Sequence, residues 1–183
     1  MGSSGGSRGT SPGLYQPGGY GFVAWTTDPA DAGTDYTLAS GLLALVRVFV
    51  PAGNVIAAVW AGVKTAGNTA GGETRAAVYD DTGARIGISA DTATWMTTSG
   101  WRSLALGASI AAAGADRYVW VASLTTYGST PTVKGNAAAV DVLLNRGTAN
   151  RRSVFLTSQT TAPASVDLTA ATLNTAIYSF ALS

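Results

Sequence analysis

The 183-residue sequence contains no cysteine and no histidine. Without cysteine there are no disulfides, no zinc thiolates and no thiol nucleophile, so the fold must hold without covalent cross-links. Without histidine there is no Ser-His-Asp triad, no Cys-His pair and none of the usual nitrogen ligands for transition metals. These two absences remove most enzyme classes, and we expect a non-enzymatic protein with no cofactor and no metal.

Charged residues are scarce, at 11% of the chain with a formal net charge of +1. A nucleic-acid-binding surface needs an excess of basic residues, so we expect no nucleic-acid partner. Much of the surface must be uncharged, which gives little electrostatic protection from association. We therefore expect a homo-oligomer, with a trimer favoured.

Long hydrophobic runs are also missing. The most apolar stretch, GLLALVRVFVPAG, is interrupted by Arg47 and stopped by Pro51, short of the ~20 residues that cross a bilayer. The N-terminal MGSSGGSRGTSPG has no hydrophobic segment after its charge and does not read as a secretory signal. We expect no membrane insertion, and an extracellular role would need another exit route such as cell lysis.

The chain divides into an arm and one domain. Residues 1–19 are rich in Gly, Ser and Pro, and this composition predicts a flexible arm that a partner surface holds in place. Residues 20–183 contain short β-rich runs at roughly 8- to 12-residue spacing, which is typical of an all-β, antiparallel β-sandwich. The predicted strands are 42–50, 54–63, 74–80, 84–90, 101–106, 117–125, 137–144, 152–157, 165–168 and 175–182. The Ala-rich 109–115 could form a helical turn or a loop.

Several of these runs are apolar on both faces. In DRYVWVASL, Tyr118, Trp120 and Leu124 point one way while Val119 and Val121 point the other. NVIAAVWAGV has the same character. Either such strands lie against another subunit or layer, or small Ala and Thr side chains are simply exposed.

Two acidic clusters are candidate sites. Asp80 and Asp81 lie in AVYDDTGARIGIS, where Asp-Asp-Thr-Gly between two β-type runs favours a hairpin turn; adjacent strand residues also face opposite sides and make a poor catalytic pair. Asp28, Asp31 and Asp35 could ligate calcium, but their spacing misses the D-x-D-x-D-G loop and favours a capped loop. Catalysis by distant carboxylates would need Asp28, Asp91 or Asp116 to converge in the fold, and no pattern in the sequence favours this.

A basic segment, NRGTANRRS, is a candidate partner contact. It contains Arg146, Arg151 and Arg152, which could bind a carboxylate-bearing neighbour or an anionic polymer. A solvated loop is the alternative.

Aromatic residues at or near loops are candidates for glycan binding. Flat rings and a few polar groups are what a sugar-binding surface uses. The residues are Trp95, Trp101, Tyr127 and Trp25. The alternative is that they cover the ends of a core filled by Trp60 and Trp120.

Linked segments also carry a family resemblance. They are YGFVAWTTDPADA, YTLASGLLALVRVFVPAGNVIAAVWAGVKTAG, AAVYDDTGARIGIS, TSGWRSLALG and RYVWVASL. From about residue 20 to 183 the chain resembles the small β-sandwich minor tail proteins of tailed phages that infect actinobacteria. The resemblance implies a non-enzymatic virion component with a jelly-roll-like sandwich, often a symmetric oligomer, and it transfers no catalytic residues.

These inferences lead to one predicted function and two alternatives. We expect a minor tail or tail-tip protein of a phage virion, docked on other virion proteins by its N-terminal arm and exposing loops to the host surface. A capsid decoration protein is the first alternative. A carbohydrate-binding module that recognises a host cell-surface glycan is the second.

Overall fold

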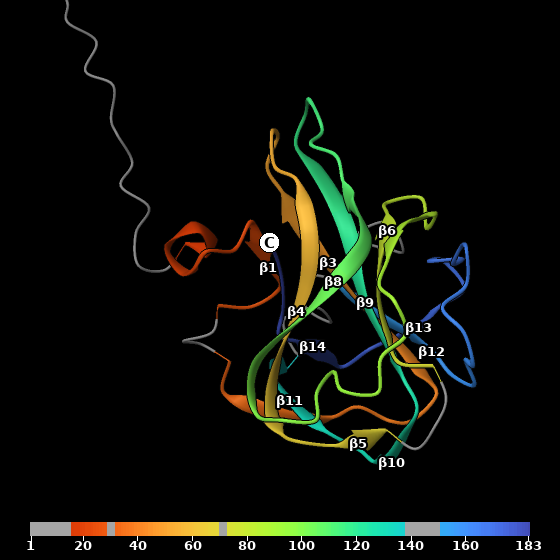
Figure 1. The fold of residues 1–183 in the computed structure, drawn as a ribbon. Coiled ribbons are helices and arrows are strands. Elements are labelled where there is room, and N and C mark those ends of the chain that lie inside the picture. The colour runs from red at the N-terminus through yellow and green to blue at the C-terminus, as the bar shows by residue number, and fades with distance from the viewer. Residues whose placement is uncertain (1–15, 29–31, 70–72, 138–150) are drawn as a thin grey trace, which may run out of the picture.

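The computed structural model describes residues 16–28, 32–69, 73–137 and 151–183, and it shows two antiparallel β-sheets packed face to face (Figure 1). Sheet A consists of β1 (Ala24–Trp25), β2 (Thr34–Thr37), β4 (Ile56–Thr65), β8 (Gly100–Ile110), β11 (Thr132–Ala137), β14 (Ala176–Tyr178) and β15 (Phe180–Leu182). Sheet B consists of β3 (Leu42–Val50), β6 (Arg75–Asp80), β7 (Arg85–Ile88), β9 (Arg117–Thr125), β12 (Ser153–Leu156) and β13 (Thr172–Leu173). A separate pair joins β5 (Asn68–Thr69) to β10 (Tyr127–Ser129), and a short 3-10 helix, η1, spans Pro17–Tyr20. The predicted all-β sandwich is confirmed.

Most of the predicted strands are present. The runs 42–50 and 117–125 coincide with β3 and β9, which pair along their full length. The runs 54–63, 74–80, 84–90, 101–106 and 152–157 correspond to β4, β6, β7, β8 and β12. The last run, 175–182, is divided by Ser179 into β14, which pairs with β11, and β15, which pairs with β4.

One predicted strand is wrong, one open choice is decided, and one prediction falls outside the described residues. Residues 165–168 form no strand, and only an isolated bridge joins Ser165 to Ala84. Of the two alternatives for residues 109–115, the structure shows the loop, which follows the end of β8 at Ile110. Most of 137–144 lies outside the described residues, and the strand that reaches it, β11, begins at Thr132.

The main core lies between the two sheets. Alternate residues of each strand point into it, as the two-residue period of a β-strand requires. From sheet B, Val46, Val48 and Val121 are buried there, and from sheet A Val59 and Phe180 are buried against them. Branched and small side chains make up most of this layer, with a few aromatic rings such as Phe180 among them, and the two sheets pack closely.

A second core lies on the opposite face of sheet B. Leu45, Tyr79 and Trp120 point away from the main core and are buried, because residues 157–171 cross over them and contribute Ala162 and Val166 to the cluster. We call residues 157–171 the strap. The strands of sheet B that are apolar on both faces therefore have one face on the main core and the other under the strap of the same chain.

The outer face of sheet A has less cover. Trp60, expected in the core, is only half-buried on this face, where its indole N–H donates to Ser183 Oγ at 2.9 Å. Phe22 from the N-terminal segment packs on it with ring centroids 5.5 Å apart. The boundary expected between residues 19 and 20 falls inside η1, so the last residues of the arm belong to the packed structure.

Candidate functional site

A surface hollow lies where the N-terminal segment meets the end of strand β3 and the β3–β4 loop. It has a volume of about 620 Å³ and is lined by residues 16–18 and 21–25 on one side and by Phe49, Pro51 and Asn54 on the other. Figure 1 shows η1 and β1 beside the C-terminus, at the edge of the sandwich. We call this hollow the aromatic groove.

Local sequence places the N-terminal wall of the groove. Pro17 starts η1 with its fixed φ, and Gly21 ends it in the left-handed region at φ 78°. The chain then turns so that Phe22 packs against Trp101 with ring centroids 5.2 Å apart, and Val23 donates its amide to the Leu182 carbonyl at 2.7 Å. Strand β1 pairs with β15 directly afterwards, so the groove wall is tied to sheet A.

Exposed hydrophobic side chains gather around the groove. Five large hydrophobic side chains are markedly exposed among the described residues, and four of them are Tyr20, Phe49, Val55 and Tyr118. Phe49 lines the groove, and Val55 follows the lining residue Asn54. Tyr20 packs against the groove residue Trp25, and Tyr118 packs against Phe49, each with centroids 5.5 Å apart. Such a concentration at one place marks an interaction site more often than scattered apolar residues do.

The ring of Tyr118 is held in place by Arg47. The Arg47 guanidinium lies 4.1 Å from the ring centroid and also donates to both carboxylate oxygens of Asp81, at 2.8 and 2.5 Å. A bidentate pair of this kind fixes the plane of the guanidinium. The positive charge next to the groove is therefore already paired, and no charged side chain appears among the described residues that line the groove.

The structure separates the predicted glycan-binding residues. Trp25 lines the groove. Trp101 is half-buried under Phe22, and Trp95 is buried on the inner face of sheet A with its indole N–H donating to the Arg102 carbonyl at 3.1 Å. Tyr127 lies in β10, but its side chain is outside the described part of the structure. Trp95 is not accessible to a sugar, because core packing encloses its ring.

The arginines of the basic segment are used within the chain where they are described. Arg151 Nη1 donates to the Ala171 and Leu168 carbonyls at 2.6 and 3.3 Å and so holds one end of the strap. Arg152 Nη2 reaches the Thr26 carbonyl at 3.5 Å. Arg146 lies outside the described residues. The prediction that these residues contact a partner is untested, but Arg151 has a clear structural role.

Asp80 and Asp81 form the predicted turn. Asp80 Oδ1 accepts from the Thr82 hydroxyl at 2.6 Å and from the Thr82 and Ala84 amides at 2.9 and 3.0 Å. Burial raises the pKa of Asp80, but these hydrogen bonds and one from the Gly83 amide outweigh it and leave the pKa below its ordinary value. The carboxylate thus stays ionised and shapes the hairpin, while Asp81 pairs with Arg47.

The second acidic cluster is dispersed. Asp35 forms an ion pair with Lys134 at 2.7 Å across the β2–β11 pair, and Asp31 lies outside the described residues. Within the residues that the structure describes, no group of three carboxylates is placed to hold a metal ion. The other carboxylates considered for catalysis accept backbone amides, Asp91 from Thr74 at 2.7 Å and Asp116 from Ala52 at 2.8 Å.

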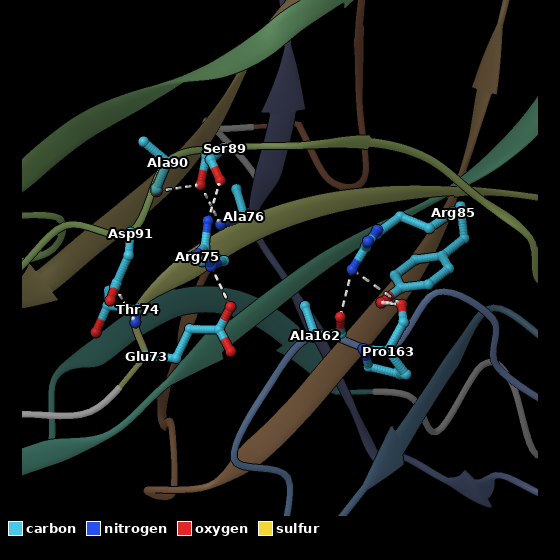
Figure 2. Close-up of polar contacts among 11 residues, drawn as sticks. Glu73, Thr74, Arg75, Ala76, Arg85, Ser89, Ala90, Asp91, Ala162 and Pro163 are labelled. Carbon is cyan, nitrogen blue, oxygen red and sulfur yellow. Dashed lines mark hydrogen bonds and ion pairs between the residues drawn. The ribbon is translucent and has the colours of Figure 1, made fainter.

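A polar cluster near strands β6 and β7 is structural. Figure 2 shows Arg75 between Glu73 and Ser89, and Arg85 reaching Ala162 and Pro163 of the strap. Tyr79 OH donates to the Pro163 carbonyl at 3.0 Å, and burial raises the pKa of Tyr79 to about 12. Arg85 and Tyr79 donate to backbone carbonyls of the strap, so this part of the cluster fixes the chain and offers no reactive centre.

Sequence reasoning did not identify Phe22, Phe49 or Asn54 as groove residues, or Tyr118 as the ring that packs against Phe49. The only available signal was that two-sided strands carry aromatic residues on both faces. Comparisons with protein-family models, curated proteins and solved structures found no match. In the part of the chain that the structure describes, no helix is long and apolar enough to span a membrane.

Proposed function

We propose that this chain is a non-enzymatic structural protein of a tailed-phage virion, and within the virion a minor tail or tail-tip protein. The resemblance of its segments to such proteins supports the proposal, as does the all-β sandwich. The observation that carries it is the concentration of exposed aromatic side chains around one groove, because a surface of this kind serves binding.

The proposal assigns different tasks to the arm and the groove. The arm docks the protein on neighbouring virion proteins, and the groove and the β3–β4 loop contact the host surface. Gln16, the first described residue, lies at the groove. The fifteen residues before it could reach at most about 50 Å if fully extended, which sets the distance over which the arm can dock.

Purified particles from the strain that encodes the chain test the location. We expect mass spectrometry to detect the protein in the particles and gold-labelled antibody to mark one end of the tail. Label distributed over the head would favour a capsid decoration protein instead. Particles without the protein would overturn the proposal.

A deletion tests the role of the arm. Because residues 16–22 pack on the sandwich, only residues 1–15 should be removed. We expect this variant to keep the melting temperature of the full chain and to lose binding to particles that lack the protein. Leu173→Ala, a change at an exposed residue of β13, is the control that should bind normally. Undiminished binding of the shortened chain would contradict docking through the arm.

A further inference from the structure

The aromatic groove has the features of a binding site for an uncharged ligand. Its volume of about 620 Å³ falls in the range of small-molecule sites. The described residues that line it include no Asp, Glu, Lys or Arg. An anionic or cationic ligand would lose its hydration there without gaining a partner charge, so a neutral ligand is favoured.

Aromatic rings supply flat apolar surfaces on both sides of the groove. Trp25 lines one wall and Phe49 the other, and each is supported from behind by a tyrosine ring 5.5 Å away, Tyr20 and Tyr118 respectively. Phe49 is 45% exposed, so a ligand can reach its face. Rings that are already packed on a neighbour lose little side-chain entropy when a ligand stacks on them.

The polar side chains that accompany these rings are carboxamides. Gln16 and Asn54 are among the lining residues, together with Gly18 and Gly21, which have only backbone polar groups to offer. The Asn54 amide nitrogen donates to the Pro51 and Ala52 carbonyls at 3.1 and 3.3 Å, which fixes the orientation of the carboxamide. The Gln16 side chain makes no hydrogen bond to the end of η1. Carboxamides both donate and accept, which suits ligands with many hydroxyl groups.

We propose that the aromatic groove binds a neutral saccharide, with a sugar ring stacked on Phe49 and Trp25 and its hydroxyl groups bonded to Gln16 and Asn54. A sugar ring has an apolar face of C–H groups and a polar edge, and this combination matches rings next to carboxamides. The site lies elsewhere than the Trp95 and Trp101 set and shares only Trp25 with it. The saccharide site rests on the proposed function in that it gives the groove's contact with the host surface a ligand class, and a free carbohydrate-binding module could use the same site.

A glycan array tests the class of ligand. The full chain would be applied to neutral gluco-, manno-, galacto- and arabino-oligosaccharides and to sialylated, sulfated and phosphorylated oligosaccharides. We expect binding to at least one neutral series and none that requires an anionic group. Decaproline is a further probe, because extended proline-rich peptides also dock on aromatic grooves.

Substitutions test the location, with titrations followed by tryptophan fluorescence. We expect Phe49→Ala to weaken the binding of the best neutral oligosaccharide at least about tenfold, and Gln16→Ala by about threefold or more, through loss of stacking and of a hydrogen bond. Leu173→Ala removes a similarly exposed apolar side chain, 42% exposed and outside the groove lining, and should change nothing. Thermal melts that match the wild type show that the variants are folded.

Several outcomes would overturn the saccharide site. They are no binding to any neutral oligosaccharide, binding only to anionic ones, affinity for decaproline in place of sugars, or affinity unchanged in both groove variants. None of these outcomes depends on whether purified particles contain the protein, so failure of the saccharide site and failure of the virion proposal can be told apart.

Discussion

Polar side chains in this chain act mainly on its own backbone. Asp80 holds the β6–β7 turn, Arg151 holds the end of the strap, and Tyr79 holds its middle. Each hydrogen bond of this kind contributes about 1 kcal/mol, and much of its value lies in avoiding an unpaired buried group. A chain with few charges thus uses some of them to fix segments that have no regular secondary structure.

Tyr79 gives a prediction at this scale that depends on pH. Burial raises its pKa in the folded state to about 12, above the ordinary value of about 10. The neutral phenol therefore contributes stability that is complete below about pH 10 and is lost as pH rises through the folded-state pKa. We expect wild type to lose stability between about pH 10 and 12 more steeply than Tyr79→Phe. At neutral pH the variant should be about 1 kcal/mol less stable, through loss of the hydrogen bond to Pro163.

Urea denaturation at a series of pH values measures both effects. Tyr118→Phe is the matched control, because Tyr118 is 47% exposed and should give a curve close to wild type. Identical pH profiles for Tyr79→Phe and wild type would show that the phenol is not buried as described.

At the scale of elements, the strap depends on close approach to the β6–β7 hairpin. The Val166 amide donates to the Gly83 carbonyl at 2.8 Å, and a Cβ at Gly83 would lie 2.0 Å from the Val166 carbonyl oxygen. Gly83 also has φ at 90°. Only glycine combines this conformation with such a short distance to a neighbouring backbone.

We expect Gly83→Ala to destabilise the protein in two ways. The positive φ costs about 1–2 kcal/mol for a residue with a Cβ, and the clash with the strap adds about 1–3 kcal/mol. Gly53→Ala isolates the first effect, because Gly53 has φ at 80° and no atom within 4 Å of its Cβ position. Denaturant unfolding should give a clearly larger loss for Gly83→Ala, and proteases should cleave its strap faster. Equal losses in the two variants would show that the strap does not press on the hairpin.

The strap also explains which elements the sequence could predict. Long runs such as 42–50 and 117–125 were identified correctly, because alternation and β-branched residues act locally. Residues 165–168 have a similar composition, but they add no strand to either sheet. Their apolar side chains, Val166 and Leu168, pack on the outer face of sheet B instead. Tyr118 and Trp120 lie on the same face of β9, yet only Trp120 is buried. The strap covers Trp120 and does not reach Tyr118. This difference depends on tertiary structure, so no local sequence pattern could predict it.

The candidate site was also only partly predictable, because local patterns do not show which side chains the rest of the fold covers. Trp25 was identified because it is an aromatic residue near a loop, and this local property is correct. Phe49 lies inside a predicted strand, 42–50, and the sequence does not indicate whether its side chain is exposed. Its exposure depends on its pairing with Tyr118 at the uncovered end of sheet B. The residues of the groove therefore could not be predicted before the strand register was known.

At the scale of the whole molecule, the part of the outer face of sheet A formed by β4 and β8 carries an uncharged patch around Ala58 and Ala105. Ala58 and Ala105 are paired across β4 and β8 on this face, and Trp60 and Ser103 form the next pair. The strap covers the outer face of sheet B, so a second copy of the chain is not needed to bury that face. If copies associate to cover an apolar sheet face, that face belongs to sheet A. Small uncharged side chains at Ala58, Ser103 and Ala105 allow close contact between copies and add no charge repulsion there.

We predict that the full chain associates through this face, with a trimer favoured, and that Ala105→Glu prevents association. The exposed Ala105 side chain leaves room for the carboxylate in the monomer, whereas in an oligomer the carboxylate would be buried without a partner charge. Multi-angle light scattering at high micromolar concentration should give the mass of an oligomer for wild type and of a monomer for Ala105→Glu. Ala115→Glu places the same charge in the exposed β8–β9 loop and should leave the oligomer intact. A monomeric wild type would contradict the prediction, and an Ala105→Glu variant that still associates would move the contact to another surface.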